Sequence, residues 1–68
     1  MFIKKGTKLT VEDNRKGTFQ ATAAEDFDTE ADEFYPVITQ EYVCGRANEW
    51  YPGEKIPCRK GISRIIVE

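Results

Sequence analysis

The chain has 68 residues, of which 40% are hydrophobic and 12% aromatic, and its formal net charge is −2. This composition is too apolar for a disordered chain, and the length allows one domain with a small core, spanning residues 1–68. The sequence has no apolar run of membrane-spanning length and no hydrophobic region of a signal peptide near residue 1, so we expect a cytoplasmic protein without a membrane segment, as a monomer or a homodimer.

The first part of the chain carries strand and turn signals. Residues 2–5 are expected to form a short leading strand that ends before Gly6. Residues 8–11 and 18–23 alternate polar and apolar side chains, and residues 13–17 between them have turn chemistry that ends in a glycine. This pattern predicts a β-hairpin.

Residues 21–40 contain no Lys or Arg but six carboxylates, which gives this stretch a charge of −6, whereas residues 1–20 carry +3 and residues 41–68 carry +1. Ala24, Phe27, Ala31, Phe34 and Ile38 follow a helical spacing, which predicts a short helix ended by Pro36. The competing interpretation is an ordered acidic loop between two strands, because dense like charges disfavour an isolated helix.

The second half of the chain again favours strands. Residues 35–44 are rich in Val, Ile, Thr and Tyr, residues 51–54 place Pro and Gly at the centre of a type II turn, and residues 55–58 suit another strand. The apolar run in residues 62–67 predicts a buried final strand. We therefore expect a mainly β fold, a small antiparallel sheet or barrel-like single domain, with or without one short helix in the acidic segment.

The residue inventory offers little for catalysis. The chain has no His and a single Ser, so it lacks the usual general bases and triads, and we expect neither an enzyme nor a cofactor. Cys44 and Cys58 either form one disulfide or stay reduced; without a signal peptide we expect reduced, partly buried thiols. Residues 26–37 resemble a calcium loop only in part, because Ala31 and Val37 replace the required Gly and Glu, so no metal site is predicted.

The acidic segment is the strongest candidate for a binding surface. Its carboxylates could imitate a row of phosphates and engage a basic groove on a partner protein, and the adjacent aromatic side chains, with Phe27 among them, would serve as apolar anchors. The alternative is a solvated surface that only keeps the protein soluble. The candidate partner-binding residues are Glu25, Asp26, Asp28, Glu30, Asp32, Glu33, Phe34 and Tyr35.

A second hypothesis uses the basic ends of the chain to bind single-stranded nucleic acid on a small barrel. One set of residues would combine Phe2 and Phe19 with the Lys and Arg of the first twenty residues: Lys4, Lys5, Lys8, Arg15 and Lys16. The other set would place Arg59, Lys60 and Arg64 near Trp50 and Tyr51. The sequence pI of about 5.1 makes nucleic acid the less favoured partner.

Three elements of the chain are loosely similar to SH3 domains, over about half of its length. They are the acidic residues 24–28 and 32–34, the single Trp50, and the Ile-Pro pair in residues 53–57. The resemblance implies a small barrel whose groove for proline-rich peptides would include Phe27, Tyr35, Trp50 and Pro57. This chain differs from the family in its single Trp, which lies close to the Ile-Pro pair, and in the hairpin that precedes the acidic residues.

Together these features predict a small non-enzymatic protein-binding module. An acidic domain without catalytic residues suits an inhibitor or accessory regulator, of the kind that bacteriophages and mobile elements direct against host machinery. The alternatives are a small-barrel nucleic-acid or peptide-binding domain and a structural subunit of a larger assembly.

Overall fold

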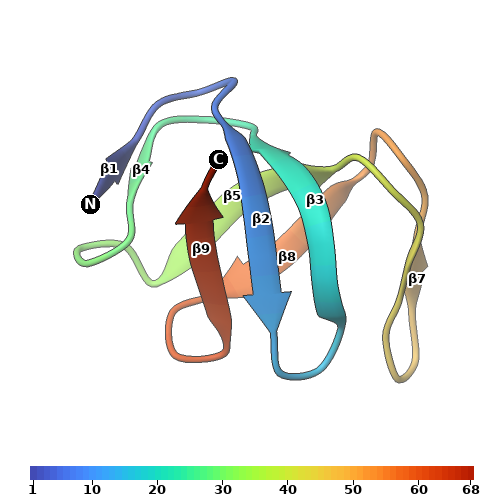
Figure 1. Ribbon diagram of the computed structural model, residues 1–68. Coiled ribbons are helices and arrows are strands. Elements are labelled where there is room, and N and C mark those ends of the chain that lie inside the picture. Colours follow the sequence, from blue (N-terminus) through green and yellow to red (C-terminus); the bar gives the residue numbers. More distant parts are fainter.

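The computed structural model describes residues 1–68 as nine β-strands without a helix (Figure 1). Five strands form an antiparallel sheet in the order β8-β5-β3-β2-β9. Its strands are β2 (Lys8–Asp13), β3 (Gly17–Ala23), β5 (Phe34–Thr39), β8 (Lys55–Arg59) and β9 (Ser63–Val67). Two further pairs are β1 (Phe2–Ile3) with β4 (Phe27–Asp28), and β6 (Val43–Cys44) with β7 (Glu49–Trp50). The predicted mainly β fold is confirmed.

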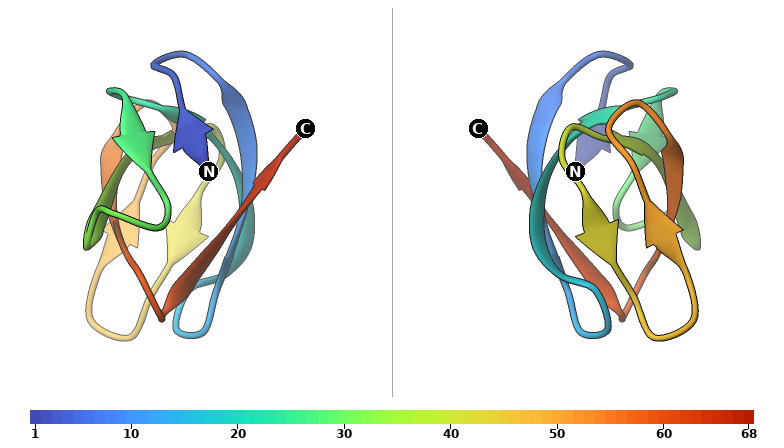
Figure 2. Two further views of the ribbon diagram at one scale, coloured as in Figure 1. Left: turned by 90° about the vertical axis from the view of Figure 1, so that its left-hand side faces the viewer. Right: turned by 90° about the vertical axis from the view of Figure 1, so that its right-hand side faces the viewer.

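The main sheet is strongly curled. Strands β9, β2 and β3 lie on one side, and β5 and β8 cross behind them (Figure 1). The turn that joins β8 to β9 and the turn that joins β2 to β3 lie at the same end of the molecule (Figure 2). The β1–β4 pair lies on the side away from the β6–β7 hairpin (Figure 1). No helix in the structure is long and apolar enough to cross a bilayer.

The predicted first hairpin is confirmed. Lys8 pairs with Thr22 and Asp13 with Gly17, so β2 and β3 are in register over their full length. Alternate residues on both strands point into the core, as the period-two pattern requires. Gly17 has a φ of +84°, a conformation that a side chain would strain, which explains the glycine at the end of the turn.

The acidic segment, residues 25–33, forms a short strand and a turn. The predicted helix is therefore wrong, and the ordered loop is correct. Within the proposed helical stripe, Phe27 is 3% exposed but Phe34 is 64% exposed, and the two side chains therefore do not share a buried face. Phe27 pairs with Ile3 in a β ladder, and the only helical feature is one backbone hydrogen bond from Asp32 to Asp28.

The second half follows the predicted strands with two corrections. Residues 35–44 form two strands, because the chain turns after Thr39, whose hydroxyl hydrogen-bonds to the Glu41 carbonyl at 2.6 Å. The final strand, β9, is only partly buried: Ile65 packs on the core, whereas Val67 is 41% exposed. The reason is that β9 is the edge of the sheet and pairs only with β2. The predicted turn at residues 51–54 is present, with Gly53 at a φ of +93°.

A single core fills the curled sheet. It draws on every strand except β7 and β9, and Trp50 and Ile65 of those two pack against it. Its members are Ile3, Leu9, Val11, Phe19, Ala21, Ala23, Phe27, Tyr35, Val37, Val43, Ile56 and Cys58. Because the small strand pairs contribute Ile3, Phe27 and Val43, they are tied to the same core as the main sheet.

Candidate functional site

The aspartates of the acidic segment are used to fold its backbone. Asp26 Oδ1 accepts a hydrogen bond from the Lys5 N–H at 2.7 Å, which fastens the segment to the chain after β1. Asp28 Oδ1 accepts the Glu30 N–H at 2.9 Å, and Asp32 Oδ2 accepts the Asp28 N–H at 2.7 Å. Side-chain acceptors of this kind stabilise turns, so these three predicted site residues have a structural role first.

The N-terminal amine lies over the same turn. Its nitrogen is 3.4 Å from Asp28 Oδ1 and 3.7 Å from Glu30 Oε2. The hydrogen bond from the Glu30 N–H, together with the amine of Met1, holds the pKa of Asp28 below its usual value of 3.8. Asp28 therefore stays ionised in the folded protein at neutral pH.

The glutamates of the segment, in contrast, project into solvent. The side chains of Glu25, Glu30 and Glu33 are 66%, 87% and 71% exposed. Glu25 lies 3.8 Å from the Lys55 ammonium, and Glu33 lies 4.0 Å from the Arg59 guanidinium. Ion pairs this exposed contribute little to stability, so the glutamates are free to exchange these partners for another cation.

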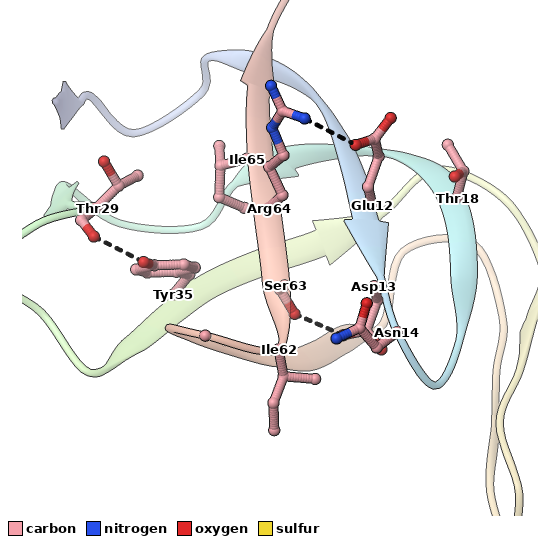
Figure 3. A pocket seen from close by; sticks show the side chains of 11 residues that line it. Glu12, Asp13, Asn14, Thr18, Thr29, Tyr35, Ile62, Ser63, Arg64 and Ile65 are labelled. Carbon is pink, nitrogen blue, oxygen red and sulfur yellow. Dashed lines mark hydrogen bonds and ion pairs between the residues drawn. The ribbon is translucent and has the colours of Figure 1, made fainter.

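Phe34 and Tyr35, the two predicted aromatic anchors, lie on opposite faces of β5. Phe34 is 64% exposed, and the Arg59 guanidinium carbon lies 5.5 Å from its ring centre. Tyr35 is 5% exposed and stacks on Phe27, with 5.3 Å between ring centres. Its hydroxyl donates to the Thr29 carbonyl at 2.7 Å (Figure 3), and burial raises its pKa above 10.0. Tyr35 thus belongs to the core, and only Phe34 is available to a partner.

An apolar groove of about 480 Å³ runs along the outer face of β5 and β8 beside Phe34. Pro36 and Pro57, which lie opposite each other in the ladder, line it together with the stem of Lys55. Because the ion-pair partners of Glu25 and Glu33 are Lys55 and Arg59 on β8, the groove borders these two glutamates, and Glu30 lies in the turn between them in the chain. We call this combined area the acidic-apolar surface: Glu25, Glu30, Glu33, Phe34, Pro36 and Pro57.

A second groove, of about 610 Å³, lies between the β2–β3 turn and the tip of the β6–β7 hairpin. We call it the basic groove, and its chemistry comes from Arg15, Lys16, Arg46, Asn48 and Trp50. The Lys16 ammonium lies 5.5 Å from the centre of the Trp50 ring. Sequence reasoning grouped Trp50 with Arg59, Lys60 and Arg64, whereas the fold places it beside the turn of its own hairpin and beside the β2–β3 turn, which is remote in sequence.

A polar hollow of about 480 Å³ lies around β9, and its charged groups already engage one another (Figure 3). Arg64 Nη1 lies 3.7 Å from Glu12 Oε1, and Ser63 Oγ donates to Asp13 Oδ2 at 2.5 Å. Ser63 is 7% exposed and also lies 3.4 Å from the Arg59 N–H, so its hydroxyl is a structural link in this hollow.

The base of the β6–β7 hairpin, where the chain enters and leaves it, carries a tyrosine pair that sequence reasoning missed. Glu49 accepts hydrogen bonds from the hydroxyls of Tyr42 at 2.7 Å and Tyr51 at 2.9 Å. These hydrogen bonds lower the pKa of Glu49 below 4.5 and raise the pKa of both tyrosines above 10.0. Tyr42 and Tyr51 are nine positions apart, and no pattern in the sequence indicates that both contact the Glu49 carboxylate.

The thiols and carboxylates are dispersed. Cys44 is exposed, Cys58 is buried, and both are free. No group of three His, Cys, Asp or Glu side chains comes close enough to hold a metal ion.

The four residues of the SH3-type groove do not form one surface. Phe27 and Tyr35 stack inside the core, whereas Trp50 and Pro57 line the basic groove together. Comparison of the chain with protein-family models, curated proteins and solved structures found no match. The predicted small β fold therefore stands on the structure alone.

Proposed function

We propose that this protein is a small non-enzymatic binding domain that contacts a partner protein through the acidic-apolar surface. The observation that carries the proposal is the position of Phe34, which is 64% exposed at the edge of an apolar groove and bordered by glutamates. Large exposed aromatic residues are the usual anchors of protein interfaces, and charged rims provide selectivity and fast association.

The partner, in this proposal, has a basic surface beside an apolar side chain or loop. The ion pairs of the three glutamates are weak and exposed, so a partner cation can replace the Met1 amine, Lys55 or Arg59 at little cost. The aspartate hydrogen bonds fix the turn that presents them, which lowers the entropy lost on binding. A rigid acidic surface of this size suits an inhibitor or accessory regulator of the phage-encoded kind.

We also propose a cytoplasmic location. Support comes from Cys44 and Cys58, which are both free thiols, as is usual in a reducing compartment.

The test is quantitative capture from a lysate by immobilised protein, at low and high salt, followed by binding of the isolated partner. The charge variant Glu25→Gln/Glu30→Gln/Glu33→Gln and the anchor variant Phe34→Ala should each weaken binding of that partner at least tenfold. The control variant Lys4→Gln/Lys5→Gln/Lys8→Gln, at exposed positions outside this surface, should bind like the parent. Equal binding by the parent and the charge variant would refute the proposal.

A further inference from the structure

Two of the three cations that line the basic groove, Arg15 and Arg46, have no carboxylate partner. The ion pairs of the structure engage Lys16, Lys55, Arg59, Arg64 and the N-terminal amine, but neither Arg15 nor Arg46. No exposed carboxylate lines this groove. The Asp13 carboxylate that pairs with Lys16 is itself buried and also accepts two backbone hydrogen bonds. The groove therefore presents a positive potential to solvent.

Trp50 is the only tryptophan of the chain, and it is held in place within this groove. Its ring lies so close to Gly45 that a Cβ at that position would come within 3.1 Å of the indole Cζ3 atom. A side chain at position 45 would crowd the indole, so the glycine lets the hairpin lie close against the ring. The Lys16 ammonium also lies 5.5 Å from the centre of the Trp50 ring. The half-buried indole is therefore a fixed aromatic surface beside three cations.

The overall acidity of the protein does not extend to this groove. The acidic segment contains β4, which pairs with β1 on the side of the molecule away from the β6–β7 hairpin (Figure 1). The tips of the β2–β3 and β6–β7 hairpins lie together at one end (Figure 2). The sequence pI of about 5.1 averages two oppositely charged regions, so it does not describe the basic groove.

We propose that the basic groove binds a segment of single-stranded nucleic acid, with phosphates paired to Arg15 and Arg46 and a base packed against Trp50. A nucleotide unit combines an anion with a flat ring, and the groove combines guanidinium groups with an indole. An acidic peptide supplies the anion without the ring, and a duplex keeps its bases stacked inside. The single strand is therefore the occupant that uses both features of the groove.

The groove provides its own probe, because all tryptophan fluorescence of the protein comes from Trp50. The experiment titrates the protein with an oligothymidylate of about 12 nucleotides, within the roughly 4–16 that a small barrel domain occupies. Saturable quenching at low salt is expected. The variant Arg15→Gln/Arg46→Gln should bind at least tenfold more weakly, with a log–log salt slope smaller by about 1.4, or about 0.7 for each phosphate contact.

Three comparisons decide the outcome. The variant Trp50→Phe, followed by anisotropy of a labelled oligonucleotide, should lose affinity but keep the parent salt slope. The control Lys4→Gln/Lys5→Gln/Lys8→Gln should bind within about twofold of the parent if phosphate contacts are confined to the groove. A polyglutamate peptide and a duplex of equal length should bind more weakly than the single strand. The proposal is wrong if no quenching occurs at low salt, if polyglutamate or duplex binds as well, or if the lysine variant loses as much affinity as the arginine variant.

Discussion

The hydroxyl of Ser63 donates a hydrogen bond to the carboxylate of Asp13, with 2.5 Å between the two oxygens, although the residues are 50 positions apart. The other oxygen of Asp13 accepts the backbone N–H groups of Arg15 and Lys16 at 2.7 and 3.0 Å. Asp13 thus organises its own turn and fastens it to the start of β9. The contact joins the two turns at the end of the molecule where the basic groove opens.

Replacement of Ser63 by Ala should destabilise the protein by about 1.5–3 kcal/mol, because it leaves a buried carboxylate without one of its donors. For a domain of this size, each kcal/mol lowers the melting temperature by roughly 4–8 °C. Thermal unfolding followed by circular dichroism measures the change. The exposed Thr18→Ala variant is the matched control and should shift little; an equal shift for both variants would show that the Ser63 contact is not stabilising.

Asp13 should also shape the stability of the protein in acid. Burial alone would raise its pKa, but the hydrogen bonds from Ser63, Arg15 and Lys16 outweigh burial and hold the pKa below the ordinary 3.8. A carboxyl with a lowered folded-state pKa stabilises the fold above its unfolded pKa, and this contribution is lost as the pH falls through the folded value. The parent should therefore lose more stability than Asp13→Asn between about pH 5 and pH 3 in urea unfolding. Equal losses would contradict this role.

The two cysteines should react very differently. Burial raises the pKa of the Cys58 thiol to about 11, although Ser63 and Lys16 act in the opposite direction, whereas Cys44 is exposed. At pH 8 a thiol reagent should label one cysteine in the native protein and both after unfolding, and Cys44→Ser should show no native labelling. A reducing agent should leave the melting temperature unchanged. A drop of several degrees on reduction would reveal a disulfide between them.

The aspartates and the glutamates of the acidic segment should differ in their effect on the stability of the protein. The double variant Asp26→Ala/Asp32→Ala removes acceptors of backbone N–H groups and should lower the melting temperature by several degrees. The triple glutamate variant Glu25→Gln/Glu30→Gln/Glu33→Gln should stay within about 0.5 kcal/mol of the parent, because its ion pairs are exposed. The reverse order of effects would mean that the glutamates hold the turn.

Most of the strands were predictable because local patterns determine them. The alternation around residues 8–23, with Gly17 at the turn, and the Pro-Gly turn at residues 52–53 each encode their own structure. The helical stripe in the acidic segment failed because the spacing of apolar residues does not show that Asp26, Asp28 and Asp32 capture backbone N–H groups. The prediction of a buried final strand was wrong because the sequence does not reveal which strand lies at the edge of the sheet.

The candidate sites were less predictable than the strands, since they depend on contacts between distant segments. The exposed glutamates and Phe34 were identified from composition. Tyr35 was predicted to be on the surface, but adjacent strand residues face opposite sides, so Tyr35 points into the core while Phe34 points to solvent. The basic groove was missed because Arg46 and Trp50 meet Arg15 only after two separate hairpins pack side by side. Charge and aromatic content indicated the chemistry, and the topology determined which residues share a surface.

The most direct test of the proposed function is an amide chemical-shift map of the isotope-labelled protein with the isolated partner. Shifts should concentrate in residues 25–34 and along the apolar groove of β5 and β8, at the amides of Val37, Ile56 and Cys58, because Pro36 and Pro57 have no amide N–H. The amides beside Arg15, Arg46 and Trp50 should move little. Shifts that concentrate in the basic groove or along β9, with residues 25–34 unchanged, would show that the acidic-apolar surface is not the contact.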